Sequence, residues 1–320
     1  MRMKLKLNRW IFIIFSIIIA NFLNPALAIG NISDSQNSIL SIPIAMATDN
    51  NYFEPTLVSI VSASENANTD TKLRFYIMVT NDFSEENKIK IQKLNEKLPN
   101  CEIRIIEMSD TFSDFEKGRW GTAMYYRLKL GSVLKNESKC IYLDSDTLVL
   151  KDLGEMYRWN IGDNYVAGTP DGFRLCESYA PDLGIADMSQ YICSGSLLWN
   201  LDKVREDNTE EKFEEYLKNI SEEGRRLIFP DQDVINAVCY GKIIDMPFKY
   251  GAIVGFMYCP KYEKDPYLYR LIEKSSWEDG MKNTVVLHFV GKKPWNSCKV
   301  KFANLWHKYY SDLEKYDITE

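Results

Sequence analysis

Two aspartates, Asp144 and Asp146, stand one residue apart directly after the apolar run Ile141 to Leu143. In an extended chain, residues i and i+2 point to the same side, so the two carboxylates can converge on one point. Converging carboxylates repel unless one is protonated or a cation lies between them. Oxygen ligands of this kind suit Mg²⁺ or Mn²⁺, which usually complete their shell with water and substrate phosphates. The pair therefore predicts a divalent cation bound to a diphosphate. Hydrolysis by two carboxylates is an alternative that this spacing fits less well.

Alternating strands and helices would position this pair. The sequence predicts strands over 41–47, 73–79, 101–108 and 139–143, and helices over 54–64, 84–98 and 119–134. Such alternation is typical of an α/β domain with a mainly parallel, Rossmann-like sheet and helices on both faces. After residue 160, mixed strands and helices predict an extension of the same sheet on the acceptor side. Ligands of these sheets sit beyond the carboxyl ends of the strands, which directs attention to residues 48–52 and 144–146.

Composition excludes some classes of function. The chain has 320 residues, enough for one large domain or two modest ones, and a net charge of -6. This charge and the absence of any nucleic-acid-binding motif argue against a nucleic-acid partner. Seven cysteines include no C-x-x-C pair, which argues against a zinc site, and their odd number gives no clean disulfide framework.

Residues 1–28 predict an export signal. Basic residues precede a short apolar run, and Ala26-Leu27-Ala28 follows it, so we expect a signal peptide cleaved after Ala28. The alternative is an uncleaved signal anchor, which would tether the chain to a membrane. In either case the rest of the chain would lie on the non-cytoplasmic side, in a secretory lumen, in the periplasm or outside the cell. We expect a flexible lead-in over 29–41, the main domain over 42–310 and a tail over 311–320.

Five stretches occur in order along the chain: 44–52 (IAMATDNNY), 126–128 (YRL), 142–146 (YLDSD), 230–233 (PDQD) with Asn236, and 288–295 (HFVGKKPW). Together they resemble glycosyltransferase family 8, over about residues 42–310. The family includes bacterial lipopolysaccharide galactosyl- and glucosyltransferases and, more distantly, glycogenin. The resemblance implies a GT-A fold and the transfer of a hexose, galactose or glucose, from a UDP-sugar with retention of configuration. It also implies Mn²⁺ (or Mg²⁺) as the cofactor and a hydroxyl of a glycan or lipid-linked saccharide as the acceptor.

The resemblance implies a role for each matching residue. Asp144, Asp146 and His288 would hold the metal. Gln232, beside Asp231, would lie near the anomeric carbon. The other implied contacts are Ala47, Thr48, Asp49, Asn51 and Tyr52 to uridine, with Tyr52 stacked on the base; Ser145 to the ribose; Gly291 and Lys293 to the diphosphate; and Arg127 and Asp171 to the donor sugar.

One departure from the family pattern leaves the donor sugar open. The family commonly has Asn-Ala-Gly or Asn-Ser-Gly where this chain has Cys193-Ser194-Gly195. A thiol is a weak hydrogen-bonding group, so Cys193 would hold a sugar less well than asparagine. Two other classes remain as alternatives. A sugar nucleotidyltransferase usually carries a glycine-rich loop near the first strand, which residues 48–52 lack. An exported sugar-binding protein without activity is the other.

Overall fold

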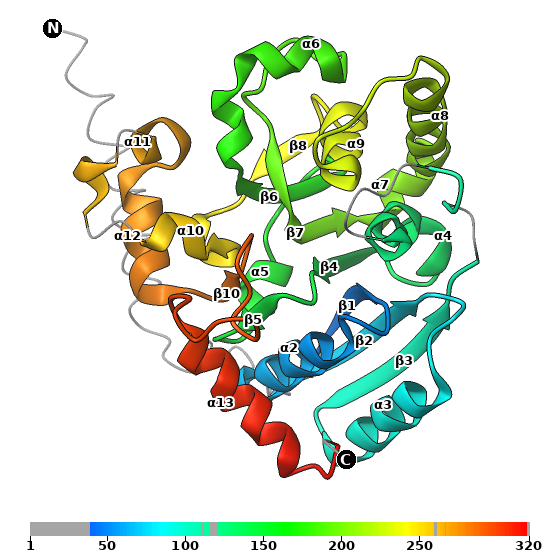
Figure 1. Cartoon of the computed structure of the whole chain (residues 1–320), viewed down its shortest axis with the longest axis vertical. Coiled ribbons are helices and arrows are strands. Elements are labelled where there is room, and N and C mark those ends of the chain that lie inside the picture. The colour runs from blue at the N-terminus through cyan, green and yellow to red at the C-terminus, as the bar shows by residue number, and fades with distance from the viewer. Residues whose placement is uncertain (1–38, 110–111, 116–120, 259–260, 266, 319–320) are drawn as a thin grey trace, which may run out of the picture. The chain divides into compact units, whose positions relative to one another are not determined.

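A mostly parallel sheet forms the centre of the computed structural model (Figure 1). The structure describes residues 39–320 except 110–111, 116–120, 259–260, 266 and 319–320. Within this part the strand order is β3-β2-β1-β4-β7-β6-β8, and β7 runs antiparallel to both β4 and β6, while the other neighbours are parallel. The strands are β1 (Leu40–Thr48), β2 (Thr71–Val79), β3 (Cys101–Glu107), β4 (Lys139–Leu143), β6 (Val166–Pro170), β7 (Ile192–Asn200) and β8 (Ile243–Asp245).

Both faces of this sheet are buried, because apolar side chains alternate between two core clusters. In β1, Ile42, Ile44 and Met46 belong to the first cluster, whereas Ala45 belongs to the second. Strands buried on both faces are nearly continuously apolar, as these are. The first cluster includes residues of α2 (Phe53–Asn66), α3 (Glu85–Lys97) and α13 (Ala303–Glu314). The second includes residues of α7 (Leu201–Glu206), α8 (Thr209–Glu222) and α9 (Pro230–Val238). The predicted α/β architecture with helices on both faces is confirmed.

A small second sheet joins distant parts of the chain. It has the order β5-β10-β9, with β5 (Thr147–Val149), β10 (Val286–His288) and β9 (Ala252–Ile253). The antiparallel register pairs His288 with Thr147, the residue that follows Asp146. This pairing is what carries His288 to the carboxyl end of β4. The other α-helices in the described part of the chain are α4 (Leu130–Val133), α5 (Gly154–Tyr157), α6 (Ala180–Leu183), α10 (Val254–Met257), α11 (Leu268–Leu271) and α12 (Lys274–Asn283).

Part of the predicted helix over 119–134 has a different form. Residues Thr122–Lys129 form a 3₁₀ helix, η1, and only one α-helical turn follows, α4. A 3₁₀ helix repeats every three residues, which places Met124 and Arg127 on one side, and the Arg127 Nε donates to the Met124 carbonyl oxygen over 3.0 Å. The α-helical spacing therefore predicts the wrong helix type over Thr122–Lys129.

The described elements extend slightly beyond the expected limits of the main domain, residues 42 and 310, at both ends. Strand β1 begins at Leu40, within the expected lead-in, and α13 continues to Glu314, past residue 310. The expected export signal lies outside the described residues. Among the described helices, none is long and apolar enough to cross a membrane. The six described cysteines are all free thiols.

Candidate active site

A cavity of about 600 Å³ opens at the carboxyl ends of β1 and β4. Of the residues that the sequence analysis assigns to a site, all but Asn51 line it. Asn51 is exposed outside the cavity. Among the described residues nine others line the cavity, and most of them belong to or adjoin one of the five motifs of the sequence analysis. The predicted residues in the wall are Ala47, Thr48, Asp49, Tyr52, Arg127, Asp144, Ser145, Asp146, Asp171, Asp231, Gln232, His288, Gly291 and Lys293; the others are Ala123, Met124, Tyr142, Cys193, Ser194, Phe229, Val290, Lys292 and Asn296.

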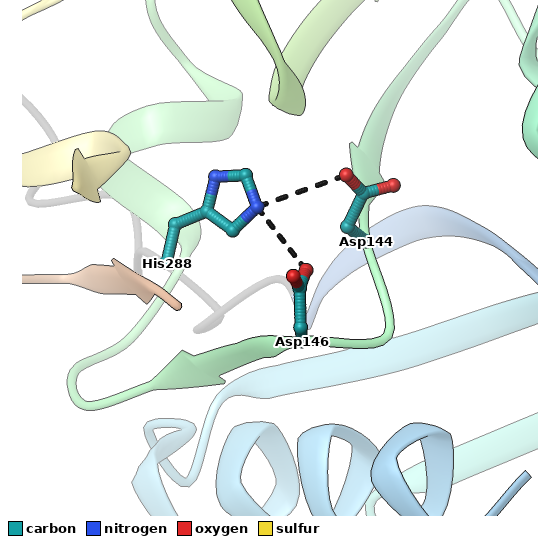
Figure 2. Close-up of side chains that lie close together, drawn as sticks. All are labelled: Asp144, Asp146 and His288. Carbon is teal, nitrogen blue, oxygen red and sulfur yellow. Dashed lines mark ion pairs between the residues drawn. The ribbon is translucent and has the colours of Figure 1, made fainter. Parts of the chain in front are cut away.

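Asp144, Asp146 and His288 converge on one point of this cavity (Figure 2). The His288 Nε2 lies 3.1 Å from Asp146 Oδ1 and 3.7 Å from Asp144 Oδ2. One ligand atom from each residue lies within 4.8 Å of the others. Two atoms that bind one cation at about 2.1 Å lie at most about 4.2 Å apart, and both distances from His288 Nε2 are within this limit. The donor set of two carboxylates and an imidazole therefore fits Mn²⁺ or Mg²⁺.

Gly195 on β7 leaves the space that the imidazole of His288 fills. A Cβ at this position would lie 2.1 Å from His288 Cε1 and 2.7 Å from Asp144 Oδ2. The Gly195 carbonyl oxygen also accepts the N–H of Asp144 over 2.9 Å. Gly195 thus holds the main chain at Asp144 by a hydrogen bond and leaves room for the His288 ring.

Lys293 and His288 face Asp146 from two sides. The Lys293 ammonium pairs with Asp146 Oδ2 and donates to the Phe289 carbonyl oxygen over 2.9 Å. Burial alone would raise the pKa of Asp146, but the charges and hydrogen bonds of His288 and Lys293 outweigh it and lower the pKa below the usual value. Asp146 is therefore an anion, as a metal ligand must be.

Arg127 is a buried residue of the cavity wall and bridges two acidic residues. Its Nη2 donates to Asp144 Oδ1 over 2.5 Å, and its Nη1 lies 3.2 Å from Asp231 Oδ2. Nη1 also donates to the Ser194 carbonyl oxygen, and the guanidinium carbon lies 4.4 Å from the centre of the Tyr142 ring. Burial would lower the pKa of Arg127, but Asp144 and Asp231 raise it above its usual value, so it stays charged. Most of its donors bind protein groups, so Arg127 holds the two acids in place.

We expect Arg127→Ala to lower the free energy of unfolding by about 3–5 kcal/mol, because it leaves the buried Asp231 and the partly buried Asp144 without their cation. Urea denaturation measures this change. Arg104→Ala is the matched control, since it removes an arginine from an exposed pair with Glu102 and such pairs contribute about 1 kcal/mol or less. Equal losses in the two variants would contradict the bridging role.

Most of the residues expected to bind a nucleoside line the same cavity as the metal triad. Tyr52 is 39% exposed, and its ring meets Trp295 edge to face at 5.9 Å. Asp49 Oδ1 accepts the N–H groups of Asn51 and Tyr52, both over 2.9 Å, so it shapes the turn into α2. The Ser145 hydroxyl is hydrogen-bonded to Thr56 Oγ1 over 2.8 Å and donates to the Ala47 carbonyl oxygen. Asp49 and Ser145 therefore stabilise the conformation of the loops that follow β1 and β4.

Gln232 and Asp231 project from the first turn of α9 into the cavity wall. Gln232 Oε1 accepts the N–H of Ser194 over 3.0 Å, and its Nε2 donates to the Tyr191 hydroxyl over 3.2 Å. Asp231 Oδ2 accepts the Ser194 hydroxyl over 3.1 Å. Asp171 Oδ1 caps the short 3₁₀ helix Gly172–Leu175 by accepting the Phe173 N–H over 2.9 Å, and burial raises the pKa of Asp171. These side chains form a polar part of the cavity wall, and hydrogen bonds to the protein hold them in place.

Asp233 is buried behind this wall and accepts hydrogen bonds from Tyr191, Tyr179 and the N–H of Phe229. Burial raises the pKa of Asp233 to about 6. A raised pKa means that the folded state holds the proton more tightly than the unfolded state. Protonated Asp233 therefore stabilises the folded state fully below about pH 4. This stabilisation, about 3 kcal/mol, is lost as the pH rises through 6.

We expect the difference in unfolding free energy between the wild type and Asp233→Asn to shift against the wild type by about 2 kcal/mol between pH 4 and pH 7. The asparagine cannot ionise, so its own stability lacks this step. Chemical denaturation at several pH values measures the difference, and a difference independent of pH would contradict the assignment.

Comparison with known proteins identifies the family of this chain. The sequence model described as glycosyl transferase family 8 matches residues 43–299. General stress protein A of Bacillus subtilis (strain 168) is 24% identical over 259 residues, which cover 79% of this chain and 87% of that protein. A lipopolysaccharide 1,2-glucosyltransferase of Escherichia coli is 25% identical over 258 residues, covering 79% of this chain and 73% of the relative.

Solved structures share the fold. The galactosyltransferase LgtC in complex with donor and acceptor sugar analogues has a TM-score of 0.70 and 26% identity, covering 85% of this chain and 96% of that chain. The apo structure of the bifunctional glycosyltransferase WbbM has a TM-score of 0.70 at 22% identity and covers 87% of this chain. This chain spans about half of WbbM, 52% of its length. The expected GT-A fold is confirmed.

Proposed function

Because the chain belongs to glycosyl transferase family 8, we propose that it transfers galactose or glucose from a UDP-sugar to a hydroxyl of a glycan or lipid-linked saccharide, with Mn²⁺ (or Mg²⁺) as cofactor and with retention of configuration. One observation carries the proposal. Asp144, Asp146 and His288 offer a cation three ligand atoms inside a 600 Å³ cavity, with Lys293 beside them. This combination suits a diphosphate that leaves with its negative charge.

The metal triad and Lys293 would act on the leaving group. A divalent cation bound there supplies Lewis-acid charge to the diphosphate as the glycosidic bond breaks. Lys293 would exchange its bond to Asp146 for one to a phosphate oxygen, as a strong charge-assisted donor. Gly291 supports this, because its φ of +83° turns the chain sharply between His288 and Lys293.

The two walls of the cavity would hold the two halves of the donor. Tyr52 would stack its exposed ring on the uracil base. On the other side, Gln232, Asp231 and Asp171 would surround the hexose. The amide of Gln232 would face the anomeric carbon as a dipole. The acceptor hydroxyl would attack from the face that the diphosphate leaves, and the departing phosphate oxygen would take its proton.

A panel of UDP-sugars with Mn²⁺, assayed by UDP release, tests the proposal. We expect turnover of UDP-galactose or UDP-glucose and none of the corresponding CDP-sugars. Release of pyrophosphate from UTP and a sugar phosphate would instead identify a nucleotidyltransferase. Binding of a saccharide with no turnover of any donor would identify a sugar-binding protein. Either result would overturn the proposal.

We further propose that residues 1–28 export the domain. The support is the basic, apolar and Ala-Leu-Ala pattern of that segment. Expression of the full chain in cells that secrete proteins, followed by fractionation and N-terminal sequencing, tests this. We expect a product that begins at residue 29 outside the cytoplasm, or a full-length product in the membrane if the segment stays as an anchor. A full-length product in the cytoplasm would refute export.

A further inference from the structure

Cys193 lies on the side of the His288 ring that faces away from the carboxylates. Its Sγ is 3.6 Å from His288 Nδ1, and both side chains are buried. Figure 2 shows that the other ring nitrogen, Nε2, points toward Asp144 and Asp146. The proposed transfer assigns no role to the contact between Cys193 and His288.

The two ring nitrogens of His288 must carry different roles if the ring binds a cation. Nε2 needs a free lone pair to be a ligand, so the proton of the neutral ring must lie on Nδ1. The Nδ1–H then donates to the Cys193 sulfur, which is a weak acceptor. Partners of this kind orient metal-binding histidines and fix which nitrogen is protonated.

Strand β7 provides both restraints on the ring. Cys193 and Gly195 are two residues apart in β7, so they share one face of the strand. Gly195 leaves the space for the ring, since a Cβ there would lie 2.6 Å from His288 Nε2. Cys193 adds the hydrogen bond that sets the rotation of the ring within this space.

We propose that Cys193 is a positioning residue that orients His288 and thereby sets the affinity of the triad for its metal. The sulfur does not reach the metal, because it contacts the opposite nitrogen of the ring. The inference rests on the proposed function, which takes the triad as a metal site, and it adds to that site the residue that controls its geometry.

The variants Cys193→Ala and Cys193→Ser separate this role from general packing. Loss of a hydrogen-bonding partner of a metal ligand typically weakens metal binding by 10–100-fold, and we expect a rise in the Mn²⁺ dissociation constant of about that size for Cys193→Ala. Serine keeps a polar atom at this position, so Cys193→Ser should recover part of the affinity.

The measurement is the electron paramagnetic resonance signal of free Mn²⁺, titrated into protein stripped with EDTA and without any donor sugar. Cys101→Ala is the matched control, because it removes another buried thiol, on β3, away from the cavity. We expect it to bind Mn²⁺ like the wild type. Unchanged affinity in Cys193→Ala, or a serine variant that binds no better than the alanine variant, would overturn the inference. A wild type that binds no Mn²⁺ would instead refute the metal site itself, and with it the proposed function.

Discussion

Replacing Asp146 by asparagine is expected to lower the rate of UDP release by about 10³-fold or more, because a bound metal contributes several kcal/mol and each 1.36 kcal/mol is a factor of ten. Asparagine has nearly the same shape but lacks the charge that faces His288 and Lys293. It therefore replaces a charged metal ligand by a neutral one and leaves the Lys293 ammonium without its anion. Steady-state kinetics with saturating UDP-hexose and Mn²⁺ measures the loss.

Asp163→Asn serves as the control for the charge change, since Asp163 is exposed and lies outside the cavity wall. Its rate should stay within a factor of two of the wild type. Asp144→Ala should lose activity as fully as Asp146→Asn does. Substantial Mn²⁺-dependent turnover in either of these two variants would contradict the metal role of that carboxylate.

Gly195→Ala is expected to abolish Mn²⁺ binding and transfer, because its methyl group would occupy the position of the imidazole. The nearest atoms would be His288 Cε1 at 2.1 Å, His288 Nε2 at 2.6 Å and Asp144 Oδ2 at 2.7 Å. The ring must then leave the carboxylates. We also expect a loss of about 1–3 kcal/mol in the free energy of unfolding, as is typical of overpacked interiors.

Gly255→Ala is the matched control for this substitution. A Cβ at Gly255 would meet only Ile253 Cγ2, at 3.8 Å, which is an ordinary contact. Alanine also favours the helical conformation over glycine, so this variant should be as stable as the wild type or slightly more so. A Gly195→Ala protein that binds Mn²⁺ like Gly255→Ala would show that the histidine ring does not depend on the space at Gly195.

The local parts of the site follow from sequence periodicity. The two-residue spacing of Asp144 and Asp146 predicts that their side chains converge, and they do, although the structure places the pair in the turn between β4 and β5 and not in a strand. The same two-residue spacing from Asp144 identifies Tyr142, whose hydroxyl donates to Asp144 Oδ1 over 3.2 Å. The alternation of apolar strands and amphipathic helices likewise predicts the α/β sheet.

The non-local parts do not follow from periodicity. His288 reaches Asp146 through the pairing of β10 with β5, a register that no local pattern specifies. Its place in the site came from the family resemblance. The burial of Arg127 between Asp144 and Asp231 likewise depends on elements far apart in the chain. The segment that carries Arg127, Thr122–Lys129, is a 3₁₀ helix and not the expected α-helix. Such contacts are set by tertiary packing, which the spacing of apolar residues does not encode.

The dependence of turnover on Mn²⁺ tests the account most directly. EDTA-stripped wild-type protein with a UDP-hexose and acceptor should release no UDP. Stepwise addition of Mn²⁺ should restore turnover along a saturating curve with one ion per chain, and Asp146→Asn should stay inactive across the same range. Full turnover in the presence of the chelator, or equal response of the wild type and Asp146→Asn to Mn²⁺, would contradict a metal-dependent transfer at Asp144, Asp146 and His288.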